Sequence, residues 1–210
     1  LLLARSDVRS SDAPRVVQLA DGSTAVLDAG TALAFAFDGQ QRRVRLLRGQ
    51  AWFQVAHEVR PFQVEAAGGL VRDIGTAFSV SMLDTTVTTQ VSAGVVDVRP
   101  GDGSVQRLHA GQARVFRDGH WLQPVQLEDP ESMAPWRRGE VVIDDRPAAQ
   151  AIADLARYRR GPVWVLGGQG ARIRVSGLFH LQQPDTAIVA VAAQAGLRVQ
   201  RLPGGALLLW

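Results

Sequence analysis

The sequence predicts a mainly β chain with a smaller α+β domain at its end: an all-β domain with a sandwich or solenoid-like sheet, then a domain of order βαββαββ. Three observations lead to this fold class. Short β-type runs separated by turn residues fill the chain to about residue 125. An acidic, proline-containing segment follows at 126–135. After Trp136 the hydrophobic period changes from two to about 3.6, which is typical of amphipathic helices.

The all-β domain is predicted to span residues 16–125. Asp-Gly and Gly-rich turns separate its strands, because glycine accepts a positive φ without a Cβ clash. Many short strands at this spacing are typical of a sandwich, a jelly roll or an irregular β-solenoid. The expected strands include Thr24–Leu27, Leu33–Phe37, Arg43–Leu47, Ala51–Ala56, Phe62–Glu65 and Ala77–Ser81.

The second domain is predicted to span residues 136–210, after an exposed linker at 126–135. Each of its two helices begins at a proline, whose missing N–H costs little at that position. Its order predicts one small sheet with both helices on one face. The expected elements are a strand at Glu140–Ile143, a helix at Pro147–Tyr158, strands at Val163–Leu166 and Ile173–Ser176, a helix at Pro184–Ala195, and strands at Leu197–Leu202 and Ala206–Leu209.

The composition excludes several classes of chemistry. All 23 basic residues are Arg, so a P-loop lysine and a Schiff-base lysine are both absent. The chain has no cysteine, and its four histidines lack metal-type spacing. No serine stands in a G-x-S-x-G elbow. A net charge of only +3 does not indicate a surface that binds nucleic acid. We therefore expect no cofactor, no metal site and no nucleic-acid partner.

Two motifs that could indicate functional sites are interpreted as local structure instead. The run Gly167-Gly168-Gln169-Gly170 suggests a phosphate loop, but a strand-like segment follows it, so a flexible hairpin tip is expected. The pair Asp144-Asp145 precedes Pro147 and is interpreted as the start of a helix rather than as paired catalytic carboxylates.

The first residues are expected to follow a transmembrane helix. Leu1-Leu2-Leu3 form an apolar stub before a polar stretch, so residues 1–15 are interpreted as the linker after that helix. A buried terminal segment or an arbitrary cut site is the alternative. No stretch within the chain reaches the roughly 20 apolar residues that span a bilayer.

Several blocks of the β domain resemble the extracytoplasmic part of FecR-type anti-sigma regulators. The family pattern has a leucine before Asp-Gly-Ser and a strand, then an Arg-x-Val-x-Leu-x-x-Gly strand pair with an aromatic sequel. Pro-Phe, Gly-Thr-x-Phe and two further glycine-containing segments follow in order. Ala93 and Gln50 stand where the family more often has Glu. The matching blocks are residues 19–28, 43–56, 60–64, 74–80, 91–98 and 108–112.

The last 75 residues resemble the short N-terminal (STN) domain shared by secretins and TonB-dependent transporters, which follows the FecR domain in these regulators. The run Trp136-Arg137-Arg138-Gly139 opens it. The segment Val175-Ser176-Gly177-Leu178-Phe179 matches its Val-x-Gly-x-Phe pattern.

The resemblance implies a periplasmic region of a single-pass inner-membrane protein. An absent cytoplasmic domain would bind an extracytoplasmic-function (ECF) sigma factor. This region would bind the N-terminal signalling domain of an outer-membrane TonB-dependent siderophore or haem transporter, and iron uptake genes would be the target. The function is thus inferred from the family, since a fold alone does not give it.

An exposed sheet edge of the small domain is the expected partner interface, because edge strands readily add a partner strand. Residues 172–179 or 206–210 would form it. The expected contact residues are Arg172, Arg174, Val175, Gly177, Phe179, Leu208 and Trp210.

The resemblance also suggests a self-cleavage site at Gly75-Thr76, because some family members are thought to cut themselves within the Gly-Thr-x-Phe signature. A threonine hydroxyl can attack the preceding carbonyl carbon when the turn favours it. The alternative is that Gly75 merely shapes a turn and Thr76 is a strand residue. The sequence alone identifies no neighbouring base.

Two other classes of function remain open at this point. The first is a carbohydrate- or peptidoglycan-binding envelope protein, which would require Trp52, Trp121 and Trp164 to be exposed as sugar platforms. The second is an enzyme with a β-barrel cleft, for which the sequence offers no metal or nucleophile motif.

Overall fold

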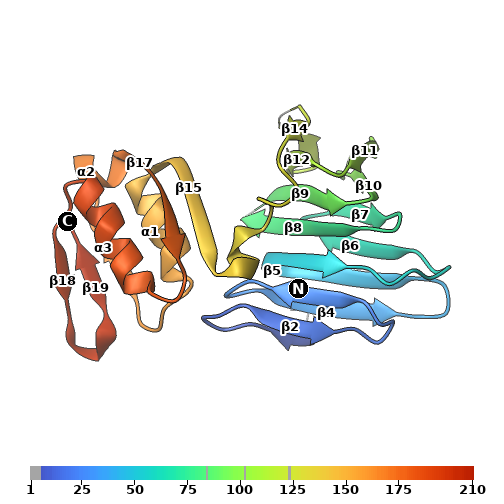
Figure 1. The fold of residues 1–210 in the computed structure, drawn as a ribbon, viewed down its shortest axis with the longest axis horizontal. Helices are drawn as coiled ribbons and strands as arrows, with labels where there is room; N and C mark the ends of the chain where they lie inside the picture. The colour runs from blue at the N-terminus through green and yellow to red at the C-terminus, as the bar shows by residue number, and fades with distance from the viewer. Residues whose placement is uncertain (1–5, 84, 102, 123) are drawn as a thin grey trace. The chain divides into compact units, whose positions relative to one another are not determined.

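The computed structural model describes residues 6–83, 85–101, 103–122 and 124–210. The chain divides into two compact units, Leu1–Ala134 and Pro135–Trp210. Figure 1 shows a β-rich first unit and a mixed second unit. Within the described ranges, no helix has the length and apolar character needed to cross a membrane.

The first unit is one continuous sheet of 14 strands. Many of its connections are short hairpins, as the Asp-Gly and Gly-rich turns predict. The strands are β1 (Val8–Arg9), β2 (Arg15–Gln18), β3 (Thr24–Leu27), β4 (Ala32–Phe37), β5 (Arg42–Gln54), β6 (Phe62–Ala66), β7 (Gly69–Asp73), β8 (Ala77–Leu83), β9 (Thr86–Ala93), β10 (Val95–Arg99), β11 (Gln106–His109), β12 (Gln112–Arg117), β13 (His120–Trp121) and β14 (Gln126–Leu127).

Strand β5 joins two halves of this sheet. Its first part pairs with β4 and β6, and the strand order continues through β7 and β10 to β11. Its second part pairs with β3 and β8, and the order continues through β9 to β12. The change occurs at Gly49, whose φ is +82° and where a Cβ would lie 2.5 Å from the Thr31 hydroxyl. Only glycine fits this bend without displacing its neighbour.

The two halves share one hydrophobic core. Val44 and Leu46 come from the first part of β5, and Ala51 and Phe53 come from the second. The Phe53 ring lies 5.7 Å from that of Phe62 and 5.5 Å from that of Phe78, centroid to centroid. The first unit therefore resembles a β-sandwich whose layers are joined by a single strand, in agreement with the mainly β fold predicted for it.

The second unit has the predicted order of strands and main helices, with bounds that shift by a few residues. A short additional helix, α2, stands where the hairpin tip at residues 167–170 was expected. The elements are the 3-10 helix η1 (Pro135–Arg138), β15 (Glu140–Pro147), α1 (Ala148–Ala156), β16 (Val163–Val165), α2 (Gln169–Arg172), β17 (Arg174–His180), α3 (Pro184–Gln194), β18 (Val199–Arg201), the 3-10 helix η2 (Pro203–Gly205) and β19 (Leu207–Leu209).

The strands of the second unit form two sheets, so the expectation of one small sheet is wrong. Strands β15 and β17 pair with each other, and β19 lies between β16 and β18. Helices α1 and α3 contact each other and share one core with both sheets (Figure 1). That core includes Ile152, Ile188, Val175 and Leu209. The sequence order alone did not reveal which strands pair.

The pair Asp144-Asp145 does not begin a helix, which corrects that prediction. Both residues lie within β15, at an irregularity of its pairing with β17. The φ of Asp145 is +44°, and its carboxylate forms an ion pair of 2.7 Å with Arg174. The Arg174 side chain donates to this carboxylate and lowers the pKa of Asp145. The Asp145–Arg174 ion pair therefore joins β15 to β17, whereas helix α1 has no side-chain cap.

Both predicted linkers contain ordered structure. Within the expected 1–15 linker, Val8 and Arg9 form β1, which pairs with β4. Within the expected 126–135 linker, β14 pairs with β12, and Met133 and Ala134 are buried. Leu1-Leu2-Leu3, the proposed tail of a membrane helix, lies outside the described residues.

Candidate functional site

A buried ion pair explains the Asp-Gly-Ser motif of the first unit. The Asp21 carboxylate lies 2.8 Å from an Arg42 guanidinium nitrogen, and the two side chains are 0% and 2% exposed. Asp21 also accepts hydrogen bonds from the Ser23 amide and hydroxyl. Burial alone would raise the pKa of Asp21, but the hydrogen bonds from Ser23 and Arg42 outweigh it and lower the pKa. The motif therefore anchors the β2–β3 turn to the start of β5.

The candidate cleavage turn connects β7 to β8. Gly75 has a φ of +87°, and Thr76 is buried. The Asp73 carboxylate accepts hydrogen bonds from the Thr76 hydroxyl and, at 3.0 Å, from the Gly75 amide. Gly94 lies against this turn: a Cβ there would be 2.3 Å from the Gly75 carbonyl oxygen. The structure thus places a carboxylate on the hydroxyl of the predicted nucleophile.

A cavity of about 240 Å³ lies beside this turn. Asp73 and Gly75 line it, together with the segment from Ala56 to Phe62, which includes His57. Such a volume has room for water, which hydrolysis of an ester at this turn would require.

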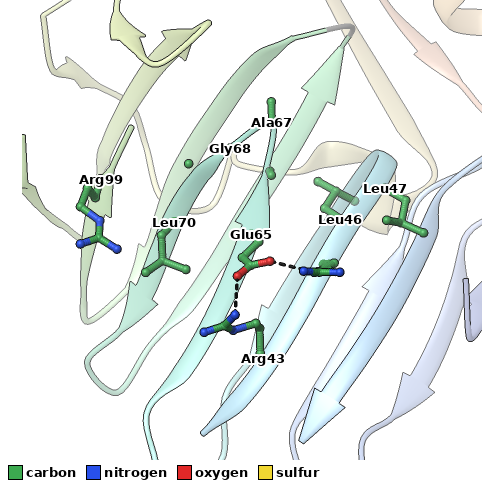
Figure 2. A pocket seen from close by; sticks show the side chains of 11 residues that line it. Arg43, Leu46, Leu47, Glu65, Ala67, Gly68, Leu70 and Arg99 are labelled. Carbon is green, nitrogen blue, oxygen red and sulfur yellow. Dashed lines mark hydrogen bonds and ion pairs between the residues drawn. The ribbon is translucent and has the colours of Figure 1, made fainter. Parts of the chain in front are cut away.

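A larger cavity, of about 520 Å³, lies on the outer face of β5, β6, β7 and β10. We call it the arginine pocket. Figure 2 shows Glu65 joined by dashed lines to two guanidinium groups, and Arg99 on the far side of Leu70. The Glu65 carboxylate lies 2.9 Å from Arg43 and 2.9 Å from Arg45. The lining residues are Arg43, Arg45, Leu46, Leu47, Glu65, Ala66, Ala67, Gly68, Gly69, Leu70 and Arg99.

The predicted partner-contact residues near β17 have mixed environments. Val175 and Phe179 are 3% and 8% exposed and belong to the core of the second unit. A Cβ at Gly177 would contact the Phe179 ring at 2.9 Å. Arg172 ends helix α2, and Arg174 is paired with Asp145. Among the described strands β17 pairs with β15 alone, so its other edge has no partner strand.

The segment containing Leu208 is not a sheet edge, which corrects the alternative interface at residues 206–210. Strand β19 lies between β16 and β18. Leu208 is directly opposite Trp164 on β16. Trp164, Leu166 and Trp210 are each between 43% and 50% exposed. This region therefore offers an apolar sheet face rather than an open edge.

The tryptophans do not meet the requirement of the carbohydrate-binding alternative. Trp52 is only 7% exposed. Trp121 is half-buried, with the Arg114 guanidinium 4.6 Å from its ring centroid. Trp164 is half exposed but belongs to the second unit. Because Trp52 is buried, the three rings do not form exposed sugar platforms.

Sequence reasoning missed two features of these sites. The first is Asp73, which stands three residues before Thr76. This short spacing could have indicated that its carboxylate accepts a hydrogen bond from the Thr76 hydroxyl. The arginine pocket had a weaker signal, the alternation of Arg43 and Arg45 on one strand face. Its other members come from β6, β7 and β10, and only the strand pairing brings them together.

Within the described part of the chain, no three His, Cys, Asp or Glu side chains gather to hold a metal ion. The fold and these sites together define a β-rich chain of two units whose first unit carries an Arg-lined pocket and a glycine-containing turn.

Comparison with known proteins finds a family match for part of the first unit. Residues 6–97 match the family model described as FecR protein. This part of the chain, from β1 into β10, is therefore similar to the FecR family. The 14-stranded sheet continues beyond residue 97, through β11 to β14. No curated protein matches the chain.

The fold of both units recurs in two crystal structures, each described as "a putative anti-sigma factor from Parabacteroides distasonis ATCC 8503". The first has a TM-score of 0.83 and 22% identity, with 97% of each chain covered. The second has a TM-score of 0.83 and 21% identity, with 98% of each chain covered. At this identity the likeness establishes the shared fold.

Proposed function

We propose that this chain is the periplasmic, signal-receiving region of a membrane-anchored anti-sigma regulator. The observation that carries the proposal is the FecR-family match over residues 6–97, supported by the fold shared along both units with the Parabacteroides structures. The regulator's cytoplasmic part would bind an ECF sigma factor and its membrane helix would precede this region. The chain acts by binding proteins and turns over no small-molecule substrate.

The proposed partner is the N-terminal signalling domain of a TonB-dependent siderophore or haem transporter, which links the regulator to iron uptake. The second unit would act as an STN-like domain. The edge of β17 that has no partner strand among the described residues supports this, because an unpaired strand edge is a template for an added strand. Beside that edge, Leu178 and its cross-strand neighbour Val142 are 56% and 60% exposed. This apolar pair would pack against the incoming strand.

Leu178→Glu is expected to weaken binding of the isolated transporter signalling domain by about 2 kcal/mol or more, the usual effect of losing a central apolar contact. The measurement is isothermal calorimetry with the signalling domains of the transporters encoded by the same genome. Leu127→Glu is the matched control, because Leu127 is 82% exposed on β14 of the first unit. Equal affinity of the Leu178→Glu variant and the wild-type chain would exclude the β17 edge. Failure of every signalling domain to bind would exclude the proposed partner.

We also propose that the chain cleaves itself between Gly75 and Thr76. The observation that favours this is the hydrogen bond from the Thr76 hydroxyl to Asp73. The hydroxyl oxygen attacks the Gly75 carbonyl carbon, and the C–N bond breaks as an ester bond forms. Asp73 accepts the hydroxyl proton and delivers it to the departing Thr76 nitrogen. Water then hydrolyses the ester, which leaves a Gly75 carboxylate and a free Thr76 amine and hydroxyl.

Intact-mass spectrometry of freshly folded protein tests the cleavage. Two associated fragments divided after Gly75 are expected from the wild-type chain, and none from Thr76→Val. Asp73→Asn is expected to slow fragment formation by about 10²- to 10⁴-fold, the usual contribution of a general base. Asp97→Asn, which removes a carboxylate from the neighbouring strand β10, is the control and should cut normally. An uncut wild-type chain after prolonged incubation would contradict the proposal.

A further inference from the structure

We propose that the arginine pocket binds a small organic anion that carries carboxylate groups on an aliphatic portion. This goes beyond the proposed function, because it assigns the first unit a ligand site of its own. The acidic groups would contact Arg45 and Arg99, and the aliphatic portion would lie over Leu70.

The strand register places these residues in one row. Arg45 pairs with Glu65, Glu65 with Leu70, and Leu70 with Arg99, along four neighbouring strands. Directly paired residues point to the same face of a sheet. Three strand spacings separate the backbones of Arg45 and Arg99, which is roughly 14 Å. Figure 2 shows the Leu70 side chain in the middle of this span, between Glu65 and Arg99.

The charges of the pocket are unbalanced. Glu65 is its only acidic lining residue, and this carboxylate already binds both Arg43 and Arg45. The three arginines therefore leave a net charge of two positive units. Among the described residues, Arg99 has no ion pair or side-chain hydrogen bond, and its side chain is exposed. Planar guanidinium groups match carboxylates bidentately, so the uncompensated charge favours an anion of this kind.

The shape and the remaining lining favour a small, partly aliphatic molecule. A volume of about 520 Å³ lies within the range of small-molecule sites. Leu70 and Leu47 are half-buried, so each still exposes apolar surface to the pocket. At one end, the β6–β7 turn passes through Ala67 and Gly68, both with positive φ. A Cβ at Gly68 would meet no atom within 4 Å, so the space beside the turn is open.

Titration with adipate, an aliphatic dicarboxylate, tests the proposal. Two-dimensional NMR of the folded chain should show saturable shifts at the amides of residues 65–70 and Arg99. Arg99→Gln is expected to weaken adipate binding by roughly tenfold or more, because a hydrogen bond between charged groups is lost. Glu65→Gln should strengthen binding, since it removes the competing carboxylate. A merely structural role for Glu65 would not produce this gain.

Arg107→Gln is the matched control, because Arg107 lies on the neighbouring strand β11, outside the pocket, and pairs with Asp97. Its affinity for adipate should equal that of the wild-type chain. If Arg107→Gln and Arg99→Gln weakened adipate binding equally, the loss would come from general surface charge, and the proposal would be overturned. Absence of saturable shifts would also overturn it. Inorganic phosphate binding as tightly as adipate would overturn the assigned aliphatic contact.

Discussion

The variant Arg42→Met is expected to lower the free energy of unfolding of the first unit by about 3–5 kcal/mol, the usual cost of leaving one member of a buried ion pair alone. Asp21 would keep its hydrogen bonds from Ser23 but lose its charged partner, at a site where its side chain is 0% exposed. Arg42 also donates to the Arg60 and Ala56 carbonyl oxygens, which would lose these donors.

Urea unfolding at neutral pH measures this loss. Combining Arg42→Met with Asp21→Asn should recover part of it, because the second change removes the unpaired charge. Arg107→Met is the control: its ion pair with Asp97 is exposed, so the change should be under about 1 kcal/mol. A loss of that small size in Arg42→Met would show that the buried pair contributes little.

The same pair gives the first unit a defined pH dependence. The folded-state pKa of Asp21 is lowered, so the unfolded chain binds the proton more readily. The stabilising contribution is therefore complete above the unfolded pKa of about 4, and it is lost as the pH falls through the folded value. Asp21→Asn should remove this part of the acid sensitivity.

The variant Phe53→Ala is expected to lower the free energy of unfolding of the first unit by about 3–5 kcal/mol, because it loses buried apolar surface and leaves a cavity between two neighbouring rings. Phe53 is 0% exposed and packs against Phe62 and Phe78. Ile188→Ala, in the core of the second unit, should lower the free energy of unfolding of that unit by about 2–5 kcal/mol. Because the two clusters contain different residues, each variant should lower one thermal transition only.

Scanning calorimetry distinguishes the two cores. We expect Phe53→Ala to shift the transition of the first unit, and Ile188→Ala to shift that of the second. A single transition that both variants lower equally would mean that the two units unfold as one cooperative body.

Local signals in the sequence predicted much of the fold. Asp-Gly pairs indicated turns, and prolines indicated the beginning of α3 and the residue before α1. Turns and helix starts can be predicted in this way because each depends on the conformation of one or two residues. Strand β5 shows the limit. Gly49 suggested a break between two strands, yet the chain continues as one strand of 13 residues. The bend is held by Thr31, whose hydroxyl bonds to the Gln50 backbone from a distant part of the chain.

The candidate sites also divide into features with a local sequence signal and features that depend on long-range strand pairing. Gly75 and Thr76 were predicted from a local signature, and their partner Asp73 is local as well. Long-range pairing decided the rest: it placed β19 inside a sheet, buried Val175 and Phe179, and assembled the arginine pocket from four strands. Side-chain periodicity identifies which face of a strand is buried, but it carries no information about which strand lies beside it.

Strand β5 also has a mechanical consequence. In an ordinary β-sandwich the two sheets contact each other through side chains and are linked by loops. Here one unbroken backbone runs from one half into the other, with main-chain hydrogen bonds to four strands along its length. We therefore expect this shared strand to resist sliding of one half past the other.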